Sequence, residues 1–258
     1  MAQHTRWARL SYQGQVVFGA VQGDVLAVHT GNLFDEPVRT REEIALSDAT
    51  WLTPCLPSKM IAMWNNYRGA ARVNGWTEPA EPLYFAKTPN SFNAHMGPIP
   101  TPRGYDGRVI YEGELGIVIG RICADVSPLD AADHIFGYTC VNDVTAVELI
   151  GRDASFPQWT RAKSFDGFGV FGPVIATGLD SRMLNVRTIV NGRERQNYPA
   201  ADMIFDPGAL VSLISRDMTL LPGDVIACGT STGALPMRPA TRVEVAIEGI
   251  GVLANVYG

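Results

Sequence analysis

Residues 111–120 have the sequence YEGELGIVIG, in which two acids precede a run of apolar residues. In an extended strand the side chains of residues i and i+2 project to the same face, so Glu112 and Glu114 point together. Gly113, between them, is expected to leave the opposite face open. Since the following residues are apolar, we expect a strand at 109–119 that runs into a buried core. The two acids therefore lie at the edge of that core.

Two carboxylates at the edge of a core repel each other unless a cation compensates their charge. Hard divalent cations prefer oxygen ligands, and Mg²⁺ commonly binds carboxylates while keeping waters that a substrate can displace. Asp143 is the third candidate ligand, because it ends the strand-like run 137–143 before an expected helix at 144–149. The alternative is that Glu112 and Glu114 line a solvated face and Asp143 caps that helix.

Downstream of the acidic strand the chain alternates further expected strands with turns. Strands are expected at 186–190, 225–228, 242–247 and 252–256, and Asn191-Gly192 is typical of a tight turn. Helices are expected to open at 127–130 and to span 207–216. Because strands and helices do not alternate regularly, a doubly wound fold is disfavoured. We expect a mixed, mainly β fold with short helices.

The first part of the chain indicates a small β-rich module. Residues 6–29 alternate apolar and polar types around Gln22-Gly23-Asp24, which favours a hairpin. The capping-box pattern at 40–43 predicts a short helix. Two prolines then interrupt the chain, and we place a boundary there, with a module at 1–57 and a catalytic domain at 58–258.

Composition limits the partners and the compartment. The 258 residues carry a formal net charge of -5, and the basic residues do not cluster, so a nucleic-acid partner is not expected. No apolar run is long enough to cross a bilayer and the first ten residues lack an apolar signal region, so we expect a cytoplasmic protein without a membrane partner. The four cysteines are widely separated, which favours buried thiols over a zinc site or a disulfide framework.

Several blocks of the sequence, in the same order, resemble those of the fumarylacetoacetate hydrolase family. Residues 111–120 resemble its E-x-E metal motif, and residues 137–143 resemble the segment with its third ligand. Residues 163–166 with Gly172-Pro173 are similar to its lysine segment. Two further blocks match at 191–196 and 221–230. The resemblance spans residues 59–258.

This resemblance implies a β-roll or β-sandwich catalytic domain and a homodimer. It implies Mg²⁺ or Mn²⁺ as the cofactor. The implied ligands are Glu112, Glu114 and Asp143. It also implies that Lys163 is catalytic or polarises the substrate. Expected substrate contacts are Tyr67, Gln196 and Thr230, the last of these to the substrate carboxylate.

The lid segment departs from the family pattern. Members that activate water for C–C bond hydrolysis usually carry N-Y-x-x-H-x-x-E there. Here residues 66–73 read NYRGAARV and place Ala70 and Val73 at the His and Glu positions. The usual dyad is therefore absent. Arg68 follows Tyr67, which resembles the isomerase-type halves of the homoprotocatechuate-pathway isomerase/decarboxylase and makes Arg68 a candidate catalytic residue.

An enolisable 2-oxo acid is the expected substrate. It would chelate the metal through its carboxylate and keto oxygens, and the metal would stabilise an enolate. Isomerisation and decarboxylation follow from an enolate, whereas C–C hydrolysis also needs a water-directed base. We expect an isomerase or decarboxylase of an unsaturated 2-oxo or 2-hydroxydienoic dicarboxylate from aromatic breakdown. The alternatives are a C–C hydrolase of an acylpyruvate or a fumarylacetoacetate-like β-diketo acid, and a member that binds metal and ligand without turnover.

Charge and proton transfer add further candidates. Three carboxylates, one divalent cation and a protonated Lys163 sum to zero, so an anionic substrate calls for additional cations. Arg68, Lys87 and Arg161 are the candidates. Lys163 transfers protons if its pKa is lowered, and it is otherwise a solvated lysine. His95 is a candidate replacement for the missing lid base, and its alternative is a structural loop histidine.

Two short motifs are typical of other classes of protein, but the segments that follow them do not fit those classes. Residues 167–172 satisfy G-x-G-x-x-G, yet a strand-like segment beginning with Pro173 follows instead of a helix that could hold a pyrophosphate. Residues 229–233 satisfy G-x-S-x-G. A serine hydrolase would also need a later helix and histidine, and no histidine follows His134.

Overall fold

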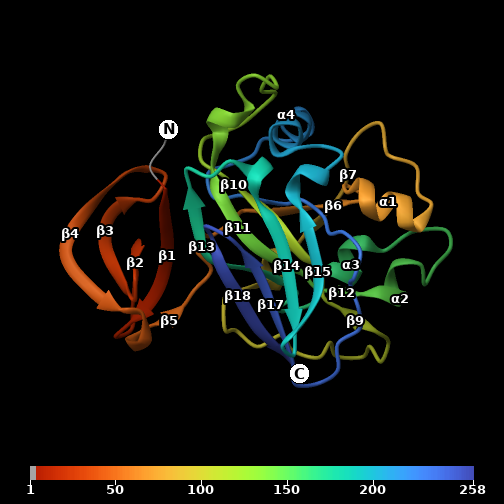
Figure 1. Cartoon of the computed structure of the whole chain (residues 1–258), viewed down its shortest axis with the longest axis horizontal. Helices are drawn as coiled ribbons and strands as arrows, with labels where there is room; N and C mark the ends of the chain where they lie inside the picture. Colours follow the sequence, from red (N-terminus) through yellow and green to blue (C-terminus); the bar gives the residue numbers. More distant parts are fainter. Residues whose placement is uncertain (1–3) are drawn as a thin grey trace.

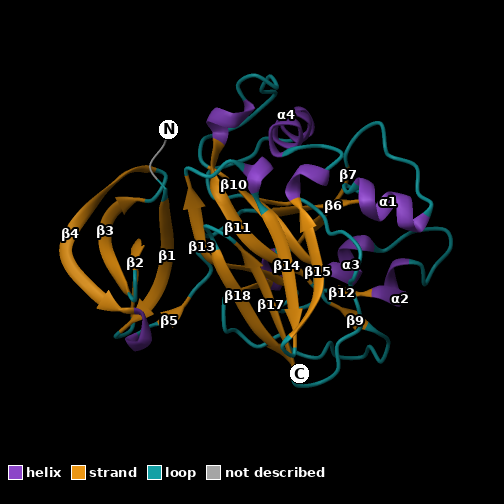
Figure 2. Ribbon diagram, in the orientation of Figure 1, coloured by secondary structure: helices purple, strands orange, loops and turns teal. Residues whose placement is uncertain are grey.

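Strands dominate the computed structural model, which describes residues 4–258 (Figure 1). A small group of curved strands lies beside a larger body that carries the α-helices (Figure 2). The expected mixed, mainly β fold is confirmed. In the described residues, no helix is both long and apolar enough to cross a membrane.

The acidic strand lies near the middle of a large sheet. Strand β10 (Gly113–Ile119) pairs antiparallel with β11 (Ile135–Asp143) on one side and β16 (Val225–Ala227) on the other. Every residue of β10 is buried, as its apolar run predicts. The same sheet continues through β13 (Gly169–Thr177), β8 (Phe92–Asn93), β6 (Met60–Trp64) and β7 (Leu83–Lys87).

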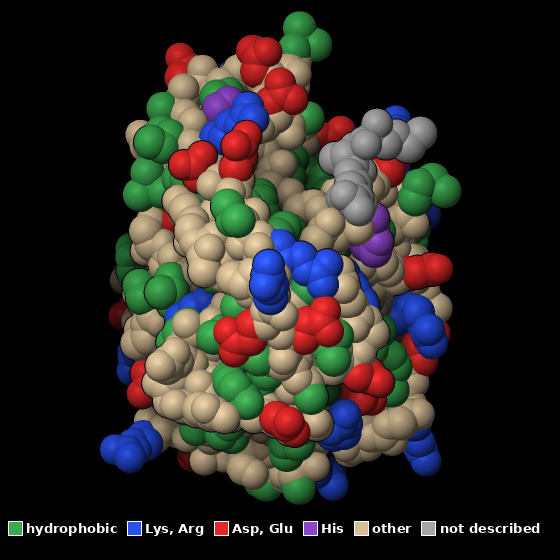
Figure 3. Space-filling view, turned by 90° about the vertical axis from the view of Figure 1, so that its left-hand side faces the viewer, with side chains coloured by type: hydrophobic (Ala, Val, Ile, Leu, Met, Phe, Trp, Pro, Cys, Tyr) green, Lys and Arg blue, Asp and Glu red, His purple; other side chains and the backbone are tan. Residues whose placement is uncertain are grey.

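The N-terminal module is a run of antiparallel strands joined to this sheet. Its strands are β1 (Thr5–Tyr12), β2 (Gln15–Gln22), β3 (Val25–Asn32), β4 (Asp35–Ala45) and β5 (Thr50–Trp51). The expected hairpin at 6–29 is confirmed, because β2 and β3 pair around a turn at Gly23. Thr5 and Trp7 of β1 pair with the end of β13, so the module and the larger body share one sheet. Figure 3 looks at the module's side of the molecule, where acidic and basic side chains are interspersed.

The expected helix at 40–43 is wrong. These residues continue β4, where Glu43 lies opposite Ala27 of β3 and Arg39 lies opposite His29. The Thr40 hydroxyl, which the capping-box pattern assigns to a helix, donates to the Val28 carbonyl at 3.0 Å. Pairing with a neighbouring strand therefore overrides the local helix signal. A 3-10 helix, Leu46–Asp48, follows the strand.

A second sheet covers the larger body. It consists of β15 (Arg193–Pro199), β14 (Asn185–Val190), β17 (Thr241–Ile247) and β18 (Gly251–Tyr257), in that order. The expected Asn191-Gly192 turn joins β14 to β15, and both residues have positive φ, of 48° and 76°. This sheet packs on β10, β11 and β13, with Leu115, Val245 and Leu253 in the shared core. The two layers form the expected sandwich, visible in Figure 1.

Within residues 4–258, four α-helices lie outside the two large sheets: α1 (Arg68–Asn74), α2 (Val147–Ile150), α3 (Trp159–Lys163) and α4 (Pro207–Asp217). Helix α4 confirms the prediction at 207–216. The Asp206 carboxylate caps it by accepting from the Ala209 N–H at 2.8 Å, and Pro207 takes the first helical position.

Two other helix predictions are only partly right. The expected helix at 144–149 begins late, since Thr145–Ala146 form strand β12, which pairs with β9 (Val109–Ile110), and α2 is a single turn. The segment at 127–130 leads only into a 3-10 helix, Ala131–His134. Three further 3-10 helices are Pro89–Ser91, Ser181–Met183 and Ala200–Asp202.

Candidate active site

Three carboxylates meet where β10 begins and β11 ends. The expected continuous strand at 109–119 is interrupted at Tyr111-Glu112, between β9 and β10, so Glu112 lies at the rim of the sheet. Antiparallel pairing places the end of β11 opposite this point, and the Asp143 N–H donates to the Glu112 carbonyl at 2.9 Å. Each of Glu112, Glu114 and Asp143 offers a carboxylate oxygen within 4.8 Å of the other two. Glu114 and Asp143 are buried, and Glu112 is half-buried.

Two buried lysines contact this acidic group. The Lys163 Nζ atom, at the end of α3, donates to Glu112 Oε2 at 2.5 Å and to Asp143 Oδ2 at 2.6 Å. The Lys87 Nζ atom, at the end of β7, donates to Asp143 Oδ1 at 2.6 Å and to the Lys163 carbonyl. Asp143 is therefore held between two ammonium groups.

These contacts shift the pKa values of the acids in different directions. Burial raises the pKa of Glu114 well above its ordinary value, and the charges of Asp143 and Glu112 add to that shift. Burial also raises the pKa of Glu112, against the attraction of Lys163. Burial opposes the ionisation of Asp143 too, but Lys163 and Lys87 hold its pKa below the ordinary value. Glu114 is thus the acid with the least compensated charge.

The pKa values of the two lysines shift in opposite directions. Burial favours the neutral form of Lys163, yet Asp143 and Glu112 hold its pKa above the ordinary value. Burial lowers the pKa of Lys87 and outweighs the attraction of Asp143. Without a cation among the carboxylates, Lys163 is therefore a firmly protonated group rather than one with the lowered pKa considered above.

The donor set suits a hard divalent cation. It consists of three carboxylates, which are the oxygen ligands that Mg²⁺ and Mn²⁺ prefer. Glu114 accepts a hydrogen bond from the Gly229 N–H at 2.9 Å, and none of the described lysines or arginines forms an ion pair with it. A cation held by Glu112, Glu114 and Asp143 would supply the compensation that Glu114 lacks.

Gly113 allows the second sheet to approach the acids. The expectation that its other face is open is wrong, because Thr188 of β14 occupies that face. A Cβ atom on Gly113 would lie 2.0 Å from Thr188 Oγ1, closer than any real contact. Thr188 is fully buried, so its side chain cannot turn away into solvent.

Replacing Gly113 by alanine is expected to destabilise the fold by roughly 1–3 kcal/mol through overpacking against Thr188. Urea unfolding of Gly113→Ala, Thr188→Ala and the double variant measures this effect. The double variant should recover part of the loss, because Thr188→Ala removes the hydroxyl that clashes. Strictly additive losses would contradict the packing explanation.

Polar side chains of β15 and the loop after β16 bind the backbone of Gly113. Its N–H donates to Gln196 Oε1 at 3.0 Å, and its carbonyl accepts from the Thr230 hydroxyl at 2.9 Å and from the Tyr198 hydroxyl. The Gln196 amide also donates to Thr230 Oγ1 at 2.8 Å. Gln196 and Thr230 therefore support the acidic strand, and of these two Thr230 also lines the adjacent cavity.

A cavity of about 500 Å³ opens beside the carboxylates. Glu112, Lys163 and Thr230 line the part of it next to the acids, which we call its inner end. Its remaining walls are largely apolar, and its aromatic side chains are those of Trp64, Trp76, Phe85 and Trp159. Sequence reasoning missed these aromatic residues, because they come from four separate segments and form no local pattern. Ala70 and Val73, at the His and Glu positions of the lid motif, both line this cavity.

The other two lid candidates point away from the cavity. Tyr67 is fully buried beside Tyr198, at 4.8 Å between ring centroids, and in the described part of the chain its hydroxyl has no hydrogen-bond partner. Arg68 donates to the carbonyls of Met203 and Ile204, and its Nε atom lies 3.7 Å from the Glu78 carboxylate. Among the described residues, neither Tyr67 nor Arg68 belongs to the cavity lining.

His95 and Arg161 also lie outside the cavity lining. His95 Nδ1 accepts from the Ala254 N–H at 3.0 Å and its ring packs on Trp51, while burial lowers its pKa. Arg161 is exposed and donates to Gln158 Oε1 at 3.1 Å on the surface of α3. The structure thus brings Lys87 and Lys163 to the acids, but not His95, Arg68 or Arg161.

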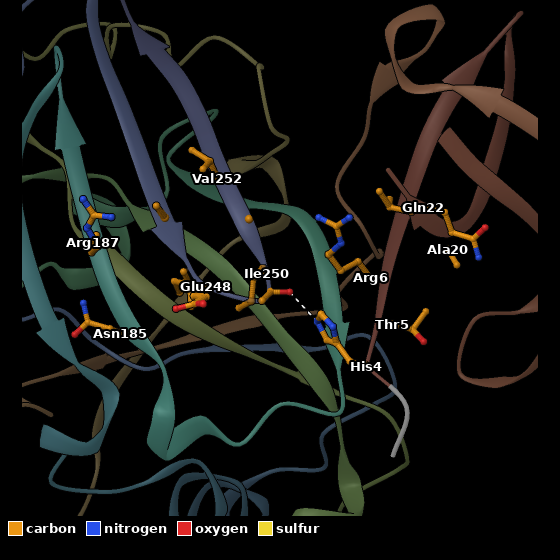
Figure 4. A pocket seen from close by; sticks show the side chains of 15 residues that line it. His4, Thr5, Arg6, Ala20, Gln22, Asn185, Arg187, Glu248, Ile250 and Val252 are labelled. Carbon is orange, nitrogen blue, oxygen red and sulfur yellow. Dashed lines mark hydrogen bonds between the residues drawn. The ribbon is translucent and has the colours of Figure 1, made fainter. Parts of the chain in front are cut away.

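A larger cavity lies elsewhere. It measures about 830 Å³ and opens between β1 and the turn that joins β17 to β18 (Figure 4). His4, Arg6 and Arg187 line it, and His4 Nε2 lies 2.9 Å from the Gly249 carbonyl. None of the three clustered carboxylates lines it, so size alone does not mark the reactive site.

The fold and the site together are those of a β-sandwich enzyme class with three carboxylates and a buried lysine at the rim of the sheet. Comparison with known protein families identifies this class. Residues 59–257 match the family described as "Fumarylacetoacetate (FAA) hydrolase C-terminal", and residues 5–54 match "Rv2993c-like, N-terminal". The chain therefore belongs to the fumarylacetoacetate hydrolase family.

Individual relatives carry different activities. Oxaloacetate tautomerase YisK of Bacillus subtilis is 33% identical over 95% of this chain and 87% of its own length. The crystal structure of 2-hydroxyhepta-2,4-diene-1,7-dioate isomerase from Mycobacterium marinum superposes with a TM-score of 0.90 at 38% identity, over 98% of both chains. Maleylpyruvate hydrolase from Sphingobium sp. SYK-6, in complex with manganese and pyruvate, has a TM-score of 0.79 at 26% identity, over 98% of this chain and 99% of that one.

Proposed function

We propose that this protein is a cytoplasmic, homodimeric enzyme, dependent on Mg²⁺ or Mn²⁺, that isomerises or decarboxylates an enolisable 2-oxo or 2-hydroxydienoic acid in the breakdown of aromatic compounds. One observation carries the proposal. Three carboxylates and Lys163 meet at the end of a cavity to which the lid contributes Ala70 and Val73. The names of the isomerase and tautomerase relatives support the same reaction type.

Glu112, Glu114 and Asp143 would hold the metal ion. When bound, it would act as a Lewis acid that polarises the 2-oxo group of the substrate. Thr230 lines the same part of the cavity, and we assign it the contact to the substrate carboxylate, for which its hydroxyl would turn from the Gly113 carbonyl to donate to the substrate. We assign Gln196 to the support of Thr230, since its amide donates to that hydroxyl.

Lys163 is the proposed proton carrier. Its Nζ atom is buried, lies against Glu112 and Asp143, and borders the cavity. A divalent cation among the carboxylates would offset the negative charges that raise the pKa of Lys163. The proton at Nζ could then be given to a substrate carbon in the cavity, and the deprotonated amine could take one back. Lys87 contributes a second fixed positive charge through Asp143. Because Arg68, Arg161 and His95 do not line the cavity, the proposal gives them no part in the reaction.

The apolar side chains at the lid positions Ala70 and Val73 favour isomerisation or decarboxylation over C–C hydrolysis. Hydrolysis of a C–C bond needs a base that directs water, and neither Ala70 nor Val73 can ionise. Proton transfer between carbon and oxygen and loss of carbon dioxide need no such base.

Enolisation should therefore occur without hydrolysis. With Mg²⁺, the protein is expected to exchange the C3 protons of oxaloacetate for deuterium, as followed by NMR in D₂O. With acetylpyruvate, it should release pyruvate at no more than the rate without protein. Release of pyruvate as fast as C3 exchange would overturn the proposal in favour of a C–C hydrolase. Absence of both reactions would favour a binding protein without turnover.

A further inference from the structure

The cavity beside the carboxylates has a continuous aromatic wall. Trp64 of β6 lies 5.1 Å from Trp76, which follows α1, and 5.9 Å from Trp159 at the start of α3, measured between ring centroids. Phe85 of β7 stacks on Trp159 at 5.4 Å. These rings come from different elements and all face one space. An aromatic wall of this kind favours an apolar or aromatic ligand group.

The lid completes the apolar surface. Val73 of α1 lines the cavity although its side chain is 74% exposed, and Trp76 is 41% exposed. Ile110, Val147 and Ile150 line the cavity from β9 and α2. Exposed apolar side chains that border a cavity are typical of surfaces that a ligand covers. Apolar side chains therefore predominate at this distal end, where Asn65 and Asn74 are neutral polar lining residues.

Charge is confined to the inner end. Among the described residues that line the cavity, Lys163 is the one cation, and it already contacts Glu112 and Asp143. The nearby Arg68 is directed to the carbonyls of Met203 and Ile204. A carboxylate placed against the aromatic wall would therefore lose part of its hydration without gaining a counter-charge, which is unfavourable.

The net charge of the inner end also disfavours a substrate with a second carboxylate. Three carboxylates and the two buried lysines, Lys163 and Lys87, carry a net charge of minus one. A divalent cation changes this to plus one, which a single substrate carboxylate neutralises. A second carboxylate would leave the buried site with an excess negative charge.

We propose that the preferred substrate is a 2-oxo monocarboxylate with an apolar or aromatic tail, which lies against Trp64, Trp76 and Trp159. This inference rests on the proposed function of the site and narrows its substrate class. It replaces the dicarboxylate that we expected from the sequence.

A matched ligand pair tests the inference. 2-Oxoglutarate and 2-oxo-5-methylhexanoate have the same shape, because an isopropyl group replaces the distal carboxylate. Titration calorimetry of the Mg²⁺-loaded protein should give a dissociation constant roughly tenfold or more lower for the isopropyl compound. 2-Oxo-4-phenylbutanoate should bind at least as tightly and change the fluorescence of the cavity tryptophans. Equal or tighter binding of 2-oxoglutarate would overturn the inference.

Val73 offers a sharper test, because it is exposed and lines the mouth of the cavity. Val73→Lys places a cation there, and should shift the ratio of the two dissociation constants at least about tenfold towards 2-oxoglutarate. Val73→Gln is the matched control, polar but neutral, and should weaken binding of the isopropyl compound without this gain for 2-oxoglutarate. An unchanged ratio in Val73→Lys would contradict a distal end that lacks cations.

Binding and turnover separate the two proposals. If the isopropyl compound binds more tightly but no C3 exchange occurs with any ligand, the substrate-class inference holds and the proposed reaction fails. If exchange occurs and the dicarboxylate binds more tightly, the reaction holds and the inference fails.

Discussion

Glu114→Ala is expected to abolish Mg²⁺ binding and to lower metal-dependent C3 exchange by roughly a thousandfold or more, since polarisation by a metal ion contributes several kcal/mol to such reactions. Glu114 is a buried ligand candidate, and none of the described lysines or arginines forms an ion pair with it. Calorimetric titration with Mg²⁺ measures the loss of binding. Glu42→Ala, which removes an exposed acid of β4, is the control and should bind Mg²⁺ normally.

The stability of the same variants provides an independent measurement. Mg²⁺ should raise the midpoint of thermal unfolding of the native protein but not that of Glu114→Ala, because only a folded state that binds the ion is stabilised by it. An equal upward shift in Glu114→Ala would place the ion elsewhere and remove the basis of the proposed chemistry.

The contribution of Glu114 to the stability of the metal-free protein should fall as the pH rises. Burial, Asp143 and Glu112 raise the pKa of Glu114 in the folded state above its unfolded value. The folded chain then binds this proton more tightly, so the contribution of Glu114 decreases as the pH rises above the unfolded pKa. Glu114→Gln should flatten this dependence in urea unfolding with a chelator present. A dependence unchanged by the substitution would contradict the burial of an uncompensated acid.

Lys163→Met is expected to lower C3 exchange by roughly a hundred- to ten-thousandfold while Mg²⁺ binding is retained. The substitution removes the proton carrier but leaves all three carboxylates. It also removes a competitor for Glu112 and Asp143, so the affinity for Mg²⁺ should stay equal or increase. This combination separates Lys163 from Glu114, whose loss removes metal binding and exchange together.

Lys59→Met is a suitable control for Lys163→Met. Lys59 is also ion-paired, to the buried Asp224 at 2.5 Å, but neither residue lines the cavity beside the acids. Its substitution should lower the free energy of unfolding and leave the exchange rate per folded molecule unchanged. If both variants lost exchange equally, or if Lys163→Met kept it, Lys163 would have a structural role only.

Much of the sheet was predictable because its signals are local. The alternating pattern of residues 6–29 and the Asn191-Gly192 turn describe hairpins whose two strands are neighbours in the chain. Helix α4 carries its own cap at Asp206. The predicted helix at 40–43 failed because pairing with β3, a contact between strands, outweighs a capping pattern.

Part of the candidate site was also predictable from local sequence, and part of it was not. The spacing of Glu112 and Glu114 places two carboxylates together, and an acid at the end of a strand-like run identifies Asp143. The sequence could not show that Lys87 and Lys163, 76 residues apart, both contact Asp143. Nor could it show that Arg68 turns towards the carbonyls of Met203 and Ile204.

By itself, the sequence determined the mainly β architecture, the acidic strand and the apolar lid positions Ala70 and Val73, because these depend on periodicity and residue type along short segments. Only the tertiary structure decided which cations reach the acids and that Trp64, Trp76 and Trp159 form one wall. Those features depend on side chains from separate strands and helices that meet across the fold. These side chains together set the charge and the shape of the cavity that a substrate can bind.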